Sequence, residues 1–123
     1  MTIQELYLKI GGDYDQAVKI MKMDKLIDRY VRKLTASGAY EKLAEAGNAM
    51  DPVQLFESAH ALKGVCANLG LTDIAAAAGE ITEEFRPGAV RKLTDAEIKE
   101  KLAAVGELYQ RTVKGIEEYT AQA

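Results

Sequence analysis

The only histidine in the chain, His60, lies in the sequence Ala59-His60-Ala61-Leu62-Lys63-Gly64. An imidazole is a nucleophile near neutral pH, so this residue is the first candidate for chemistry. Helical side chains lean toward the helix N-terminus, so Lys63 would lean toward the ring and any side chain at position 64 would stand over it. A glycine inside a helix costs roughly 1 kcal/mol relative to alanine. We interpret Gly64 as the residue that keeps the ring open to approach, and the Lys63 ammonium as a group that would attract a phosphoryl group there.

Other kinds of site are not supported by the sequence. One histidine and one cysteine, Cys66, make no cluster of metal ligands, so no metal site is expected. The glycine-rich motifs that cradle nucleotide phosphates are absent. Ser58 lies on a different helix face from His60, which argues against a serine-type triad. Cys66 falls on the apolar side of its helix and is interpreted as a small core residue.

The helix that carries His60 has the clearest boundary signals in the chain. Asp51 is a good N-cap, a proline follows at the first helical position, and Gly70 is a good residue just past the C-terminus. These signals predict a helix over 52–69. Its core seam has four- and three-residue spacing and comprises Leu55, Ala59, Leu62, Cys66 and Leu69. At about 100° per residue, His60 lies roughly 140° from the centre of that seam and points outward.

The rest of the chain also predicts helices, and strand alternation is absent. We expect two short helices opened by Thr2/Glu5 and Asp13/Gln16, a helix over 24–36, a short helix over 39–46 that ends at Gly47-Asn48, a helix from Thr72 to near Arg86, and a long last helix opened by Thr94/Glu97. Short loops between long helices make neighbours antiparallel. The expected fold is therefore all-α, an antiparallel four-helix bundle with short additional N-terminal helices, in a single domain over 1–123.

The outward side of the 52–69 helix is unusually apolar. Val53, Phe56 and Ala67 share the side of His60 and Gly64, where a solvated helix would normally carry charge. An apolar patch around an exposed histidine suggests a docking surface for another protein. The alternative is that the N-terminal helices cover this patch, wholly or in part.

Bulk properties narrow the class of protein. The chain has 123 residues and a net charge of −3, with no basic block, so nucleic acid is not an expected partner. Its apolar runs are too short to span a bilayer, and the first residues lack the layout of a secretion signal. A lone cysteine fits a reducing cytoplasm. Because Met1 is followed directly by a capping pair, we expect a complete, small cytoplasmic protein.

The stretch from Leu55 to Gly70, with Ala59-His60-x-Leu62-Lys63-Gly64 at its centre, resembles histidine-containing phosphotransfer (HPt) domains. The similarity extends to Ile74 and Ile81 and covers about 30 residues. The resemblance implies that His60 accepts a phosphoryl group from a receiver-domain aspartate or a sensor kinase and passes it to another receiver aspartate. It further implies that Lys63 helps to neutralise the phosphoryl group and that Gly64 leaves room for the receiver.

The resemblance also bears on cofactor, partners and supporting residues. The expected partners are response-regulator receiver domains and a sensor or hybrid histidine kinase. Mg²⁺ is expected in the receiver's site, so this chain should need no cofactor. Family members often carry an acid or amide about 22 residues after the histidine, where this chain has Thr82, which could hydrogen-bond a ring nitrogen. Arg86, one turn further, could contact the partner or the phosphoryl group, or be an ordinary surface arginine.

The expected function is that of a phosphocarrier in a multistep phosphorelay rather than a turnover enzyme, and a monomer is expected. An alternative is a helical adaptor that binds a receiver or kinase domain through Val53, Phe56 and Ala67 without carrying phosphate. A third possibility, a helical oligomerisation module, leaves the outward His60 and Gly64 unexplained.

Overall fold

The computed structural model describes residues 1–122, and within this range every regular element is helical. The elements are α1 (Ile3–Ile10), α2 (Tyr14–Met21), α3 (Asp24–Lys33), the 3-10 helix η1 (Thr35–Ser37), α4 (Ala39–Ala49), α5 (Pro52–Asn68), α6 (Thr72–Glu84) and α7 (Asp95–Ala121). The prediction of an all-α fold is confirmed.

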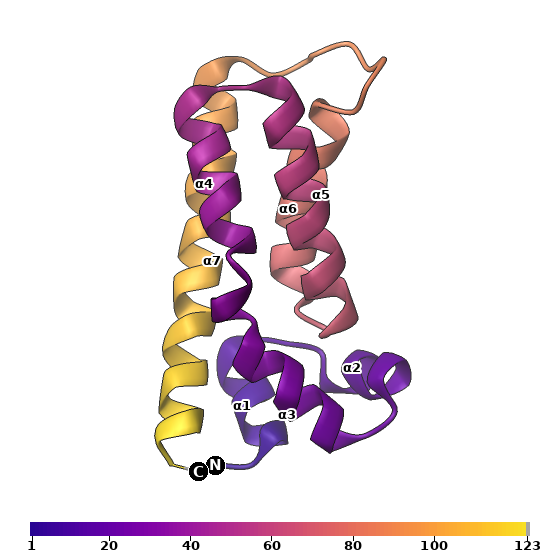
Figure 1. The fold of residues 1–123 in the computed structure, drawn as a ribbon, viewed down its shortest axis with the longest axis vertical. Helices are drawn as coiled ribbons and strands as arrows, with labels where there is room; N and C mark the ends of the chain where they lie inside the picture. Colours follow the sequence, from indigo (N-terminus) through magenta and orange to yellow (C-terminus); the bar gives the residue numbers. More distant parts are fainter. Residues whose placement is uncertain (123) are drawn as a thin grey trace.

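Four of the helices form an antiparallel bundle. Helix α4 packs against α5, α5 against α6, and α6 against α7, and α7 closes the ring against α4. Figure 1 shows successive helices of this set running in opposite directions, with α7 extending along the whole molecule. The far half of α7 contacts the short helices α1 and α3 instead. The predicted bundle with short N-terminal helices is therefore confirmed.

Side-chain caps explain where the two most important bundle helices begin. The carboxylate of Asp51 accepts hydrogen bonds from the backbone N–H groups of Val53 (3.1 Å) and Gln54 (3.3 Å), and a proline follows at the first helical position. At the start of α7, Thr94 and Glu97 form a reciprocal capping box. Both caps satisfy N–H groups that a helix start leaves without partners.

The predicted core seam of α5 is buried as expected. Leu55, Ala59, Leu62 and Cys66 have no exposed surface and Leu69 is 1% exposed. Burial raises the pKa of the Cys66 thiol to about 12. Cys66 therefore remains a neutral thiol near pH 7 and acts as a small core residue.

The helix predicted over 24–36 is shorter than expected. Helix α3 ends at Lys33, and the chain continues as a 3-10 turn before Gly38 adopts a left-handed conformation with φ of 73°. The hydroxyl of Ser37 donates to the carbonyl of Leu34 (2.7 Å) and stabilises the tighter turn. This local hydrogen bond is an alternative to the α-helical pattern, and it redirects the chain into α4.

The predicted stop at Gly47-Asn48 is wrong, because α4 continues to Ala49. Gly47 is buried, and a Cβ atom built on it would lie 2.7 Å from Cδ1 of Leu102 in α7. This glycine therefore allows α4 and α7 to approach closely. The helix ends instead at Met50, which adopts a left-handed conformation with φ of 50°.

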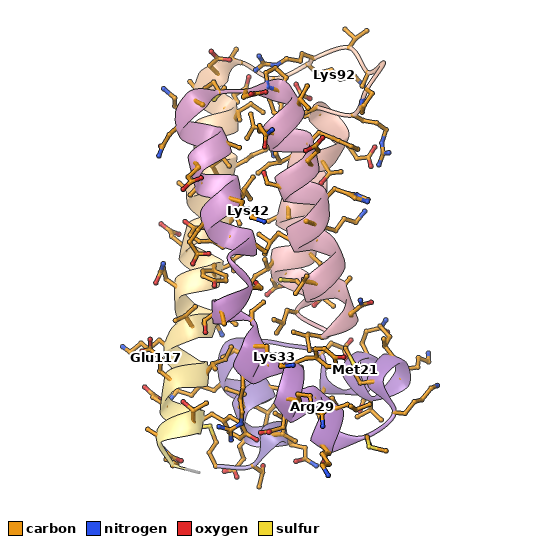
Figure 2. All side chains as sticks on the ribbon, in the orientation of Figure 1. Met21, Arg29, Lys33, Lys42, Lys92 and Glu117 are labelled. Atoms are coloured by element: carbon orange, nitrogen blue, oxygen red, sulfur yellow. The ribbon has the colours of Figure 1, made fainter. Side chains whose placement is uncertain are left out.

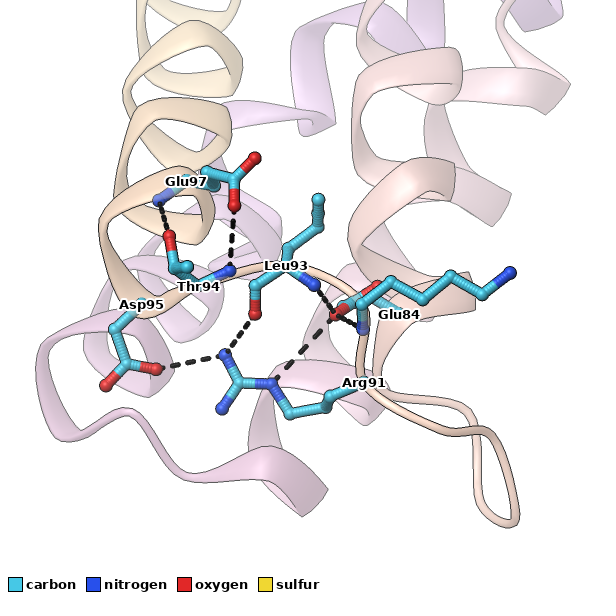
Figure 3. Close-up of polar contacts among 7 residues, drawn as sticks. Glu84, Arg91, Leu93, Thr94, Asp95 and Glu97 are labelled. Atoms are coloured by element: carbon cyan, nitrogen blue, oxygen red, sulfur yellow. Dashed lines mark hydrogen bonds and ion pairs between the residues drawn. The ribbon is translucent and has the colours of Figure 1, made fainter.

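Helix α6 ends at Glu84, before the expected end near Arg86. A residue that precedes a proline is disfavoured in helical conformation, and Pro87 follows Arg86. The buried Glu84 carboxylate accepts hydrogen bonds from the backbone N–H groups of Lys92 (2.8 Å) and Leu93 (2.7 Å), as Figure 3 shows. These contacts fix the connection between α6 and α7.

The N-terminal helices dock on the turn between α5 and α6. The Tyr7 hydroxyl donates to the carbonyl of Leu69 (2.6 Å), and the Asp13 N–H donates to the carbonyl of Gly70 (2.7 Å). A Cβ atom on Gly70 would lie only 2.2 Å from the Asp13 carbonyl oxygen. The C-terminal end of α5 is thus sealed by α1 and α2.

Candidate functional site

His60 lies in the middle of α5 and is exposed, while its neighbours Ala59 and Leu62 have no exposed surface. The prediction that its ring points outward from the core seam is confirmed. A rigid bundle helix therefore presents the imidazole to solvent at a fixed place. Such a ring is accessible to a group carried by another molecule.

One turn after His60, the structure leaves open space at Gly64. A Cβ atom built on Gly64 would meet nothing within 4 Å among the residues that the structure describes. No packing contact within this range therefore explains the glycine. This geometry agrees with the interpretation that Gly64 keeps the approach to the ring clear.

One turn before His60, Phe56 packs against the imidazole. The two rings are nearly parallel, with an interplanar angle of 11° and a centroid separation of 5.7 Å. Phe56 is half-buried, so it also contacts the edge of the core. The histidine ring consequently has an aromatic neighbour on one side and open space at Gly64 on the other.

Arg86 and Glu83, near the end of α6, complete the surroundings of this aromatic pair. The guanidinium carbon of Arg86 lies 5.5 Å from the centroid of the Phe56 ring. The same guanidinium donates to both carboxylate oxygens of Glu83, from Nη2 (2.7 Å) and Nε (3.0 Å). The pKa of Glu83 is lowered mainly by its hydrogen bonds with Arg86 and further by the positive charge of Lys63. Glu83 is therefore an ionised carboxylate close to the histidine.

The Lys63 side chain crosses from α5 to α6. A Cβ atom on Gly79 would lie 3.5 Å from Cδ and 3.9 Å from Nζ of Lys63. The small residue at position 79 thus provides the surface over which the lysine stem lies. Lys63 is half-buried, and its ammonium contributes to the positive potential that acts on Glu83.

Thr82 does not occupy the supporting position that the sequence suggested. Its side chain is fully buried, and its hydroxyl donates to the Ala78 carbonyl within α6 (2.9 Å). No hydrogen bond joins Thr82 to His60 in the described range. Glu83, the next residue, is exposed and pairs with Arg86, because one position along a helix rotates the side chain by about 100°.

The apolar patch predicted on the outer side of α5 is only partly covered. Val53 is 62% exposed, whereas Phe56 and Ala67 are half-buried. The alternative that the N-terminal helices cover this face holds for the C-terminal end of α5 alone. There an apolar groove is lined by residues of α2, α3, η1 and α5, among them Ile20, Met21, Tyr30, Leu34, Val65 and Leu69.

This groove was not foreseen from the sequence. Figure 2 shows Met21 of α2 and Arg29 and Lys33 of α3 at the same end of the molecule. The segment 14–37 carries six lysines and arginines against three aspartates, in a chain whose net charge is −3. The groove therefore lies in the most basic part of the molecule, a few residues beyond Gly64 along α5.

Comparison with known families decides the class of this site. The family model described as "Hpt domain" matches residues 25–111, which include all of α4, α5 and α6 and the candidate site. The chain belongs to the Hpt domain family. This membership confirms the resemblance found around His60.

The curated relatives carry the matching segment within much longer chains. This Hpt domain is 35% identical over 74 residues to the Sensory/regulatory protein RpfC of two strains of Xanthomonas campestris pv. campestris. The match covers 58% of this chain and 10% of each relative, so the chain spans a small part of their length. No solved structure gave a significant match.

Membership in the family establishes the general role. Hpt domains are phosphocarriers rather than turnover enzymes, and they work with receiver and kinase domains in two-component phosphorelays. Within residues 1–122 of this Hpt domain, no three histidine, cysteine or acidic residues are grouped so that they could hold a metal ion. None of the helices described in this range is long and apolar enough to cross a membrane.

Proposed function

We propose that His60 accepts a phosphoryl group from a receiver aspartate or a sensor kinase and passes it to another receiver aspartate. The observation that carries this proposal is an exposed histidine, next to open space at Gly64, on the central helix of the segment matched by the Hpt model. The same proposal expects a monomeric, cytoplasmic intermediate whose own chain needs no cofactor, with Mg²⁺ held by the receiver.

The transfer requires a neutral ring nitrogen with a free lone pair. This lone pair forms a P–N bond to the phosphorus of the aspartyl phosphate as the P–O bond to the aspartate breaks. The aspartate leaves as a carboxylate, and the other ring nitrogen of His60 keeps its proton. Transfer to the next receiver reverses these steps. With so little catalytic apparatus on this chain, positioning and electrostatics supply most of the rate.

Lys63 and Gly64 have separate proposed roles in this step. The Lys63 ammonium, supported over Gly79, attracts the transferred phosphoryl group. The open space at Gly64 allows the phosphorylated aspartate of the receiver to approach the His60 ring. Glu83 carries a negative charge, so it does not bind the phosphoryl oxygens, and its carboxylate is held by the Arg86 guanidinium instead.

We propose that the partner docks on the outer face of α5 and on the neighbouring basic segment 14–37. Val53, Phe56 and Ala67 supply apolar contacts close to His60. The basic residues of α2 and α3 other than Arg32, which is paired with Asp28, complement an acidic receiver site, since Mg²⁺ is held by carboxylates. Apolar contact would then provide affinity, while the charges orient the encounter.

The direct test is incubation of the protein with a phosphorylated receiver domain and Mg²⁺, followed by intact-mass analysis. We expect one phosphoryl adduct that is labile in acid and stable in base. His60→Gln should abolish the adduct and retain the helical circular-dichroism spectrum. Normal labelling of the His60→Gln variant would contradict the proposal. Binding to several receivers and kinases without any adduct would favour a non-phosphorylated adaptor instead.

A further inference from the structure

We propose that Arg86 and Phe56 are positioning residues that hold the His60 ring in its orientation for transfer. The contacts run from the Glu83 carboxylate to the Arg86 guanidinium, then to the Phe56 ring and the imidazole. We call the first three residues the Glu83–Arg86–Phe56 clamp. This inference rests on the proposed function of His60, and it adds a role for Glu83 of α6 and for Arg86, two residues beyond that helix, neither of which accepts the phosphoryl group.

The need for such a clamp follows from the openness of the site. An exposed helical side chain exchanges among rotamers within nanoseconds, and phosphoryl transfer depends on alignment of the attacking nitrogen with the phosphorus. Gly64 removes the neighbour that would normally restrict the ring from the C-terminal side. Phe56, one turn on the other side, lies parallel to the ring and restricts it without blocking that approach.

Arg86 is suited to fix Phe56 in place. Its planar guanidinium can lie over an aromatic face and pair with a carboxylate through two N–H groups at once, which a lysine cannot do. Both contacts are present here, to Phe56 and to Glu83. Because Glu83 lies in the last turn of α6, Arg86 follows that helix by two residues and Phe56 belongs to α5, the clamp joins the end of α6 to α5 beside His60.

The opposite end of the molecule contains a matched arrangement without a histidine. The Nε atom of Arg32 lies 3.0 Å from each carboxylate oxygen of Asp28, and its guanidinium carbon lies 5.1 Å from the Tyr119 ring centroid. This arginine therefore has the same two kinds of contact on a different pair of helices. Arg32→Ala is the control for the general effects of losing such an arginine.

The first readout is the NMR signal of the His60 ring, which requires neither phosphate nor partner. The stacked Phe56 ring shifts the imidazole proton resonances by its ring current, and Phe56→Leu defines their positions without it. We expect Arg86→Ala and Arg86→Lys to move these resonances toward the Phe56→Leu positions, at a pH where the ring is neutral. Arg32→Ala should leave them at wild-type positions.

The second readout is the rate of His60 phosphorylation by phosphoramidate, a small donor that transfers its phosphoryl group and releases ammonia. We expect Arg86→Ala to slow this reaction by about two- to fivefold, the scale of an exposed ion pair, and Arg32→Ala to leave it unchanged. Arg86→Lys should be slow as well. Rescue by lysine would overturn the inference, because it would mean that the positive charge acts on the phosphoryl group directly.

Two further outcomes separate this inference from the proposed function. Wild-type resonance positions in Arg86→Ala would overturn the clamp even if receiver-dependent phosphorylation of His60 were normal. Conversely, resonances that respond to Arg86→Ala in a protein that no phosphorylated receiver labels would support the contact chain and contradict the relay function.

Discussion

Two glycines six residues apart, Gly64 within α5 and Gly70 just beyond its end, are used in opposite ways. Gly64 borders open space, and among the described residues nothing lies within 4 Å of a Cβ atom built on it. Gly70 has a φ of 68°, and a Cβ atom there would collide with the Asp13 carbonyl oxygen at 2.2 Å. Gly64 leaves space that another molecule can enter, whereas Gly70 leaves space that the Asp13 backbone of the same chain fills.

This difference divides the outer face of α5 into an open part and a sealed part. Around His60 the helix keeps an accessible surface, with Val53 62% exposed. Around Gly70 the N-terminal helices cover the helix end, and the Tyr7 hydroxyl caps the Leu69 carbonyl. The contacts with α1 and α2 hold the C-terminal end of α5 in place. The helix therefore stays ordered around His60, although its outer face is exposed there.

Gly70→Ala should produce the largest effect. The substitution places an L-residue at a positive φ and forces its Cβ atom against the Asp13 backbone. Left-handed backbone and overpacking together should lower the free energy of unfolding by about 2–5 kcal/mol. Urea denaturation followed by circular dichroism measures this change. A loss below 1 kcal/mol would show that α1 and α2 are not held tightly on the α5–α6 turn.

Alkaline pH should have the next largest effect, because it destabilises the core side of α5. Burial raises the pKa of Cys66 to about 12, while a thiol in the unfolded chain ionises near pH 8.5. The native state therefore binds a proton that the unfolded state loses, so stability is complete below about pH 8.5 and falls as the pH rises toward 12.

The measurement is the free energy of unfolding from urea titrations between pH 7 and 11. Cys66→Ala removes this thiol, so its stability should decline less steeply with pH than that of the wild-type protein, although its value at pH 7 is lower because of the cavity. If the stability of the two proteins declined equally with pH, ionisation of Cys66 would not be the cause of the decline. Buried Tyr109, whose pKa burial raises to about 12, adds a decline common to both proteins.

Sequence patterns predicted the features that depend on one helix. Asp51 and the proline after it located the start of α5, and the spacing from Leu55 to Leu69 located its core side. The outward direction of His60 follows from that seam by helix geometry. Such patterns succeed here because the apolar stripe of α5 is regular and its caps are strong.

Features that depend on the contact between two helices could not be predicted from the pattern of either helix alone. The alanine run of α6, residues 75–78, gives no sharp apolar stripe, so the sequence did not show that Thr82 would be buried and that Glu83 would be exposed and paired with Arg86. Gly47 was mistaken for a helix stop because its reason, the approach of Leu102, comes from α7. The path of Lys63 over Gly79 also depends on the register between α5 and α6.

Gly64→Gln tests the open part of α5 and should slow transfer from a phosphorylated receiver by on the order of tenfold, or about 1.4 kcal/mol in activation free energy. A side chain at this position leans back over His60 and obstructs the incoming phosphoryl group. The bundle should remain folded, because the added atoms extend into open space. Unchanged transfer rates in a folded variant would refute the access argument.

Gly64→Ala should have the smallest effect, and its sign is opposite to that of Gly70→Ala. Alanine is about 0.5–1 kcal/mol better than glycine inside a helix, and the new methyl group meets no described atom within 4 Å, so unfolding should become harder by about that amount. Transfer should slow less than in Gly64→Gln, because a methyl group obstructs less of the ring. Urea denaturation measures the stability of both variants, and receiver-dependent labelling measures their rate of transfer.

If alanine at position 64 destabilised the protein, another group would have to fill the space there in solution, and Gly64 would then be needed for packing, as Gly70 is. If alanine stabilises the bundle while glutamine impairs transfer, the chain keeps a less stable helix at this point for the sake of access to His60.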